Sequence, residues 1–280
     1  MLWRLHLNSE VAGHLHNLNV ALAEAGRFAR IGSSTPHLMA GLTWEPGELI
    51  IEWRGPESRP DRTDQIPYEQ DELEKFADFC RLSATFAMIV ALEEFVAQLC
   101  LDARVAGPAL TSPLDFEQFQ EILEEFQEFV RKYGFSAALD EVARAAGHQR
   151  GSTNEGPDHV RRLAALPALR NCIAHRMGPV SEVFDIREGG QLVVPYRELF
   201  LTVDGHPLTQ RGHPVEAGSV LAIETREARQ SWQAGDRVAF TLRDVNNMAA
   251  GMFLDAKQLA CEVLNAFATR GGSKSSAGDE

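Results

Sequence analysis

Residues 76–99 read FADFCRLSATFAMIVALEEFVAQL, and this stretch decides the fold class. Apolar side chains fall on every side of a helix drawn through it, with few polar positions between them. A helix of this kind has to be buried, so the stretch predicts the central helix of a helical core. We expect this helix to cover residues 70–105 and to end at Gly107-Pro108.

Other segments on both sides of this helix have the apolar periodicity of helices that pack against it. They cover residues 9–31, 115–133 with a short continuation over 135–146, 158–175 and 242–268. Ser9 is a candidate N-cap for the first of them. Pro167 predicts a kink or break in the helix over residues 158–175, because proline cannot donate the helical hydrogen bond.

Short strands are expected in two places. Residues 38–44 and 48–53 flank Pro46-Gly47 and predict a hairpin, followed by a polar linker over residues 55–67. Between the fourth and the last helix, about 65 residues have strand character. The candidate strands there are residues 192–194, 199–203, 220–223 and 238–241.

Together these segments predict a mainly α fold, an antiparallel bundle of about four core helices. We expect residues 1–65 to form an N-terminal α/β appendage, a helix plus a β-hairpin. Residues 66–270 would form the helical domain, with a β-rich insertion at about 180–241, and residues 271–280 a disordered tail.

Composition points to a soluble protein, because 44% hydrophobic and 24% charged residues are ordinary values for a globular chain of 280 residues. No uninterrupted apolar run predicts a membrane span, and the first residues do not resemble a signal peptide. The four cysteines have no metal-binding spacing and suggest reduced thiols in the cytoplasm. The histidine pairs His14/His16 and His206/His213 lack a ligand pattern, so we expect neither a metal site nor a cofactor.

Charge is distributed unevenly along the chain. The formal net charge is −13, which argues against a protein that coats nucleic acid through its whole surface. Residues 131–176, however, hold eight cations and only four anions. Such a window is typical of a local site for an anionic ligand, although a solvated helix face has the same composition. Six acids and no cation occupy residues 115–128, a face that would repel RNA.

The cationic window contains the hexapeptide Arg170-Asn171-Cys172-Ile173-Ala174-His175. Arginine offers a planar fork of donors to phosphoryl oxygens, and histidine exchanges protons near neutral pH. Asn171 and His175 are four residues apart and share a helix face. The long side chain of Arg170 can reach the same point, so the segment can bind a phosphate and move a proton beside it.

This hexapeptide resembles the signature of the HEPN (higher eukaryotes and prokaryotes nucleotide-binding) domains. A second match is Ala91-Leu92-Glu93-Glu94-Phe95-Val96, which is similar to the first core helix of that family and its acid near the motif. The closing helix after Gly235-Asp236-Arg237 also fits. The resemblance covers residues 70–268, and the strand-rich stretch before the last helix departs from it.

The resemblance implies a metal-independent RNA endonuclease that acts as a homodimer, with Arg170, Asn171 and His175 as the catalytic residues. Either Glu93 or Glu94, with Glu93 favoured, would pair with Arg170 and orient it, and Arg176 would support the site. The implied setting is a toxin–antitoxin pair or antiviral defence, with an antitoxin or an activating protein as a further partner. Two alternatives remain open: a non-catalytic dimerisation module that binds a nucleotide or a protein, and an enzyme that acts on a nucleotide rather than on RNA.

Overall fold

The computed structural model describes residues 2–41, 49–51, 64–66, 70–109, 112, 114–148, 157–176, 179–181, 190–207 and 218–272. These residues contain five helices, a three-stranded antiparallel sheet and a pair of short strands, which confirms the mainly α fold. The helices are α1 (Leu2–Gly41), α2 (Gln70–Ala109), α3 (Phe116–Ala145), α4 (Asp158–Arg176) and α5 (Leu242–Gly272).

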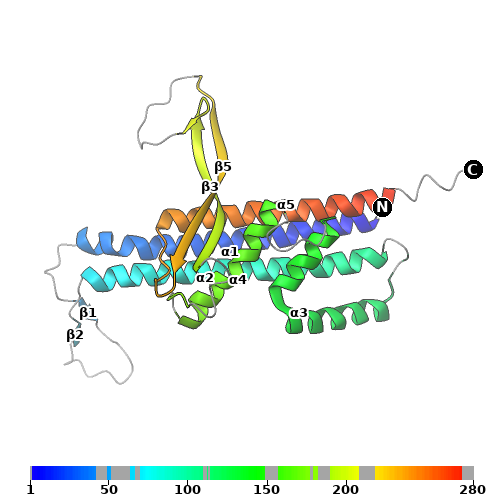
Figure 1. Ribbon diagram of the computed structural model, residues 1–280, viewed down its shortest axis with the longest axis horizontal. Coiled ribbons are helices and arrows are strands. Elements are labelled where there is room, and N and C mark those ends of the chain that lie inside the picture. Colours follow the sequence, from blue (N-terminus) through cyan, green and yellow to red (C-terminus); the bar gives the residue numbers. More distant parts are fainter. Residues whose placement is uncertain are drawn as a thin grey trace, which may run out of the picture.

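Three long helices, α1, α2 and α5, lie side by side and form the body of the molecule (Figure 1). Helix α2 is central, because it contacts each of the other four helices. Leu92, Val96 and Leu99 of α2 are completely buried in the shared core. Helix α1 adds Val11, Leu18 and Leu22 to the same core, so it belongs to the bundle.

Helix α2 is also long and apolar enough to cross a membrane, judged by length and composition alone. The expectation from the sequence did not anticipate this. Half of its most apolar window is buried inside the molecule. Its contacts with four helices account for that apolar character, as in the core helix of a soluble protein.

Two glycines allow close approaches between elements. A Cβ atom at Gly32 of α1 would overlap the side chain of Cys80 of α2, so the two helices meet at this point with no room for a methyl group. A Cβ atom at Gly251 of α5 would lie 2.8 Å from the carbonyl oxygen of Arg197, which belongs to a strand that crosses α5. Each glycine therefore sets the distance between its helix and the neighbouring element.

Local sequence signals explain the course of α3. Asp115 accepts a hydrogen bond from the backbone of Gln118, and the Gln118 side chain accepts one from the backbone of Asp115, which is a capping box. Gly134 interrupts the helix with φ of 69° and ψ of −163°. The predicted division of this region into a long and a short helical segment is confirmed.

The first predicted hairpin is wrong. Residues 38–41 belong to α1. This helix was expected to end at residue 31, but it continues to Gly41. Strand β1 (Leu49–Ile51) pairs instead with β2 (Asp64–Ile66), in a segment that was expected to be a linker. Residues 42–48 lie outside the described residues. The apolar pattern of residues 38–44 is too short to distinguish a strand from a helix, which explains the wrong prediction.

The insertion before the last helix forms one long hairpin. Strand β3 (Gln191–Val203) pairs along its whole length with β5 (Leu221–Gln233), and β4 (His206–Pro207) adds a short edge. Two of the predicted strands are therefore parts of β3, which continues through Pro195. Residues 238–241 do not form a strand, and only an isolated bridge joins Arg237 to Pro179. One end of the hairpin packs on α4 and α5, and the other projects from the bundle (Figure 1).

Candidate functional site

Helix α4 carries the hexapeptide at its C-terminal end. The helix runs from Asp158 to Arg176 with Pro167 inside it, so of the predicted kink or break the break does not occur. Leu166, Leu169 and Ile173 are buried against the core and hold the helix in place. Cys172 is also buried, and its thiol donates to the carbonyl of Pro179, which fixes the chain just after the helix.

Arg170 forms an ion pair with Glu93 of α2. Its Nε atom donates to Oε1 of Glu93 at 3.1 Å, and its Nη2 atom lies 3.1 Å from the same oxygen. This contact is the pairing that the sequence predicted. About a third of the Arg170 side chain, 32%, remains exposed. In the part of the chain that the structure describes, its Nη1 amino group has no hydrogen bond or ion pair and is available to another acceptor.

His175 is exposed on the last turn of α4, and Asn171 is half-buried one turn before it. Within the described ranges, no side chain or backbone group binds the His175 ring. Arg176 ends the helix, but its side chain lies outside the described residues. A single protomer therefore presents one oriented guanidinium, one amide and one accessible imidazole at the end of α4. These groups can bind an anion and transfer a proton to or from it.

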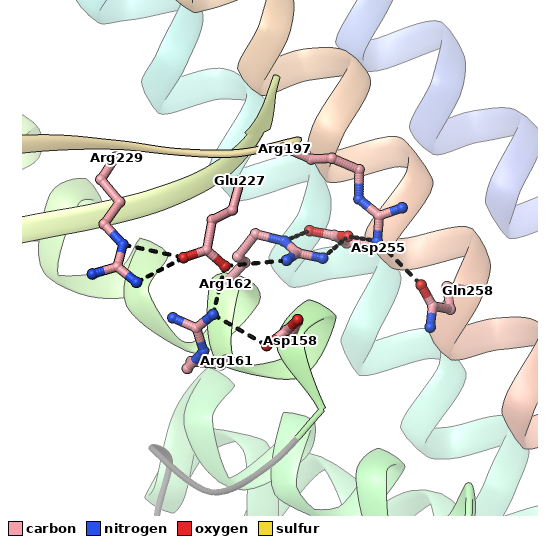
Figure 2. Close-up of polar contacts among 8 residues, drawn as sticks. All are labelled: Asp158, Arg161, Arg162, Arg197, Glu227, Arg229, Asp255 and Gln258. Carbon is pink, nitrogen blue, oxygen red and sulfur yellow. Dashed lines mark hydrogen bonds and ion pairs between the residues drawn. The ribbon is translucent and has the colours of Figure 1, made fainter. Parts of the chain in front are cut away.

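A second polar cluster lies near the other end of α4, and the sequence did not predict it (Figure 2). Its centre is Asp255 of α5, a carboxylate that is only 2% exposed. Arg162 binds both of its oxygens, with Nε–Oδ2 and Nη2–Oδ1 distances of 2.7 and 2.8 Å. Arg197 of β3 lies 2.8 Å from Oδ1. One buried carboxylate thus joins α4, β3 and α5.

Glu227 of β5 extends this cluster toward solvent (Figure 2). Arg161 donates to it at 2.5 Å and Arg229 at 2.9 Å. Burial opposes the ionisation of Glu227, but the hydrogen bonds from Arg229 and Arg161 outweigh burial and hold the pKa of its carboxyl below the usual value. The same bond raises the pKa of the Arg161 guanidinium. Glu227 and Arg161 are therefore both charged at neutral pH.

A polar surface cleft of about 380 Å³ opens beside the cluster. The side chains that line it include His159, Arg162, Arg197, Arg226 and Glu227. Three arginines face this cleft, and each is already paired. Asp255 binds both Arg162 and Arg197, and Glu227 also lies near Arg162. Glu198 binds Arg226 at 2.8 Å. The cleft is therefore a network of internal ion pairs and not an open anion site.

A third group consists of His148, His159 and Glu262. The Nε2 atoms of the two histidines lie 2.8 and 2.9 Å from the same carboxylate oxygen of Glu262. They come from the end of α3, the first turn of α4 and the middle of α5, and no sequence spacing predicts that they meet. The histidines considered from the sequence are placed elsewhere: His14 lies 3.2 Å from Asp102, and His206 is exposed in β4. His213 is outside the described residues.

The chain was compared with known proteins in three ways. No family model, no curated protein and no solved structure matches it.

Proposed function

We propose that this protein is a metal-independent RNA endonuclease of the HEPN type, with Arg170, Asn171 and His175 as its catalytic residues. The observation that carries the proposal is the state of Arg170: Glu93 orients its guanidinium from α2, while 32% of its side chain stays exposed. The ion pair fixes the guanidinium and leaves part of it accessible to a phosphate. His175, on the same helix end, is also accessible.

In the proposed reaction, RNA supplies its own nucleophile. The His175 imidazole removes the proton from a 2′-hydroxyl, and the 2′-oxygen then attacks the adjacent phosphorus. The bond from phosphorus to the 5′-oxygen breaks, and a general acid protonates that oxygen. The products are a 2′,3′-cyclic phosphate and a 5′-hydroxyl end. Arg170 stabilises the additional negative charge on the phosphorane, and Asn171 positions the 2′-hydroxyl or the imidazole.

One protomer offers a single histidine at this site, whereas the reaction needs a base and an acid. We therefore propose a homodimer in which two α4 helix ends face each other across a two-fold axis. The second His175, or a water molecule, would act as the acid. Arg176 would add positive charge beside the motif. We place the enzyme in the cytoplasm, where a toxin–antitoxin or antiviral role requires an inhibitor or an activator as a further partner.

The test is cleavage of a labelled structured RNA and of total tRNA in EDTA by the wild type, His175→Ala and the control His206→Ala. His206 is exposed in β4 and has no part in the proposed chemistry. Cleavage by the wild type and the control alone, with cyclic-phosphate ends, supports the proposal. Equal cleavage by all three proteins indicates a contaminant. No cleavage by a folded dimer favours the alternative, a non-catalytic module that binds a nucleotide or protein.

Mixed dimers separate the two candidate acids. Wild-type protomers and His175→Ala protomers with different tags are combined, and the heterodimer is purified. If the second histidine is the acid, the heterodimer loses nearly all activity, because each site then lacks one of its two groups. If water is the acid, the heterodimer keeps about half the activity per dimer, since one intact base remains.

A further inference from the structure

Three ligand-type side chains, from the turn after α3, the first turn of α4 and α5, meet near the start of α4. The donor atoms of His148, His159 and Glu262 all lie within 4.8 Å of one another. The rings of the two histidines are 5.8 Å apart between centroids and inclined by 68°, so their Nε2 atoms converge while the rings themselves do not stack. Both atoms point to one oxygen of the Glu262 carboxylate.

Hydrogen bonding does not fully account for this arrangement. The His148 ring makes a 2.8 Å hydrogen bond to Glu262. The Nε2 atom of His159 lies 2.9 Å from the same oxygen, but it has no hydrogen-bond partner of acceptable geometry in the described part of the chain. His159 is only 2% exposed. A buried ring nitrogen in this state is destabilising unless a further ligand binds it.

The local backbone builds this convergence. Helix α3 ends in a Schellman motif, in which His148 donates to the carbonyl of Ala143 and Gly147 donates to that of Arg144, each at 3.0 Å. Gly147 has φ of 93°, a left-handed conformation that favours glycine. This turn directs His148 toward α5. On α5, Gln258 donates to the other oxygen of Glu262 at 3.2 Å and so orients the carboxylate.

We propose that His148, His159 and Glu262 bind a divalent transition-metal ion of the zinc class. Two imidazole nitrogens and one carboxylate oxygen are a common zinc ligand set. Tetrahedral zinc places its ligand atoms about 3.3 Å apart, so the present 2.8 and 2.9 Å contacts need to open by only a few tenths of an ångström. The Gln258 contact is the kind of outer hydrogen bond that orients a metal ligand.

The metal would tie α5 to the end of α3 and the start of α4 and thereby stabilise the bundle. His148 and Glu262 keep 25% and 28% of their side chains exposed, so a fourth position is open to water. The site is separate from the proposed nuclease site, because His159 and His175 are 16 residues apart on one helix, or roughly 24 Å. The metal therefore takes no part in RNA cleavage, and the two proposals fail or succeed independently.

The test uses the untagged full chain, stripped with EDTA, dialysed and titrated with Zn²⁺ or Co²⁺. We expect one ion per chain, visible absorption bands of four-coordinate cobalt, and a higher melting temperature with Zn²⁺. Glu262→Gln keeps the shape of the side chain but weakens binding at least about 10-fold, and His148→Ala does the same. His14→Ala, at another half-buried histidine paired with an acid, binds as the wild type does.

Two results would overturn the proposal. One is a folded wild-type protein that binds neither ion at micromolar concentration. The other is equal binding by the wild type, Glu262→Gln and His148→Ala, which would place the ion elsewhere. Because circular dichroism of each variant reports folding before the titration, a variant that has unfolded cannot be mistaken for one that has lost a ligand.

Discussion

Nε of Arg170 donates to Oε1 of Glu93 at 3.1 Å, across 77 residues of sequence. The bond joins α4 to α2, the central helix, and it sets the direction of the guanidinium at the end of α4. Neighbouring Glu94 is exposed and does not share in it. Two adjacent acids on one helix therefore have different environments, which makes them a matched pair for mutagenesis.

Glu93→Gln should reduce RNA cleavage by roughly 10- to 100-fold, because a neutral amide no longer fixes the guanidinium beside the phosphate. The unfolding free energy should fall by about 1–2 kcal/mol, the cost of losing a charged hydrogen bond in a half-buried position. Cleavage assays and urea titrations measure the two effects. Glu94→Gln should change neither quantity, and an equal effect of both substitutions would contradict the assigned role of Glu93.

Asp255→Asn should lower the unfolding free energy by about 3–5 kcal/mol, because it leaves Arg162 and Arg197 without their shared carboxylate in a buried place. Urea denaturation followed by circular dichroism gives the value. The control is Asp158→Asn, which breaks an exposed pair with Arg161 and should cost no more than about 1 kcal/mol. Similar losses for both would mean that the buried cluster is not a stabilising junction.

Gly32→Ala should destabilise the protein by about 1–3 kcal/mol, since the new methyl group overlaps the Cys80 side chain. Gly13→Ala, on the same helix, should instead stabilise it by about 0.5–1 kcal/mol, because nothing lies within 4 Å of its added Cβ and alanine favours the helix. Melting temperatures of the two variants should therefore move in opposite directions. A rise for both would show that α1 and α2 are farther apart than described.

Among the four cysteines, only Cys261 should react quickly with a thiol reagent in the native protein, because the other three are buried. Burial chiefly raises the pKa of Cys100 to about 12, so its reactive thiolate is almost absent at pH 8. Cys261→Ser should abolish the fast phase.

Cys100 should also make the stability of the protein depend on pH. Since the pKa of Cys100 is higher in the folded state than in the unfolded state, its contribution to stability is complete below about pH 9 and declines between there and pH 12. Cys100→Ala should flatten the measured pH dependence across this interval.

Local signals in the sequence located each helix, although α1 extends beyond the predicted residues 9–31 at both ends. The apolar stretch within α2, the Asp115 and Gln118 capping pair and the break at Gly134 are each determined by neighbouring residues, so a single sequence contains them. The strands were harder to predict. The partner of β1 lies at residues 64–66, and the pairing of β3 with β5 continues through Pro195; both depend on long-range contacts.

The candidate sites differ in the same way. The contact of Arg170 with Glu93 was predicted because a family resemblance connected two distant segments. For Arg162 and Asp255, which are 93 residues apart, no motif made such a connection. His148, His159 and Glu262 also lack a ligand spacing, and they meet only because a Schellman turn and two helices bring them together. The uneven charge of residues 131–176 was the only signal near them.

The position of Asp255 has a consequence for synthesis on the ribosome. Arg162 and Arg197 are both translated before the carboxylate that neutralises them. Until α5 leaves the ribosome, Arg162 and Arg197 lack the buried carboxylate that they share, so packing α4 and β3 into the core is unfavourable. A nascent chain that stops before residue 255 should therefore stay open, bind chaperones and be degraded, which delays assembly of the bundle until its last helix has been made.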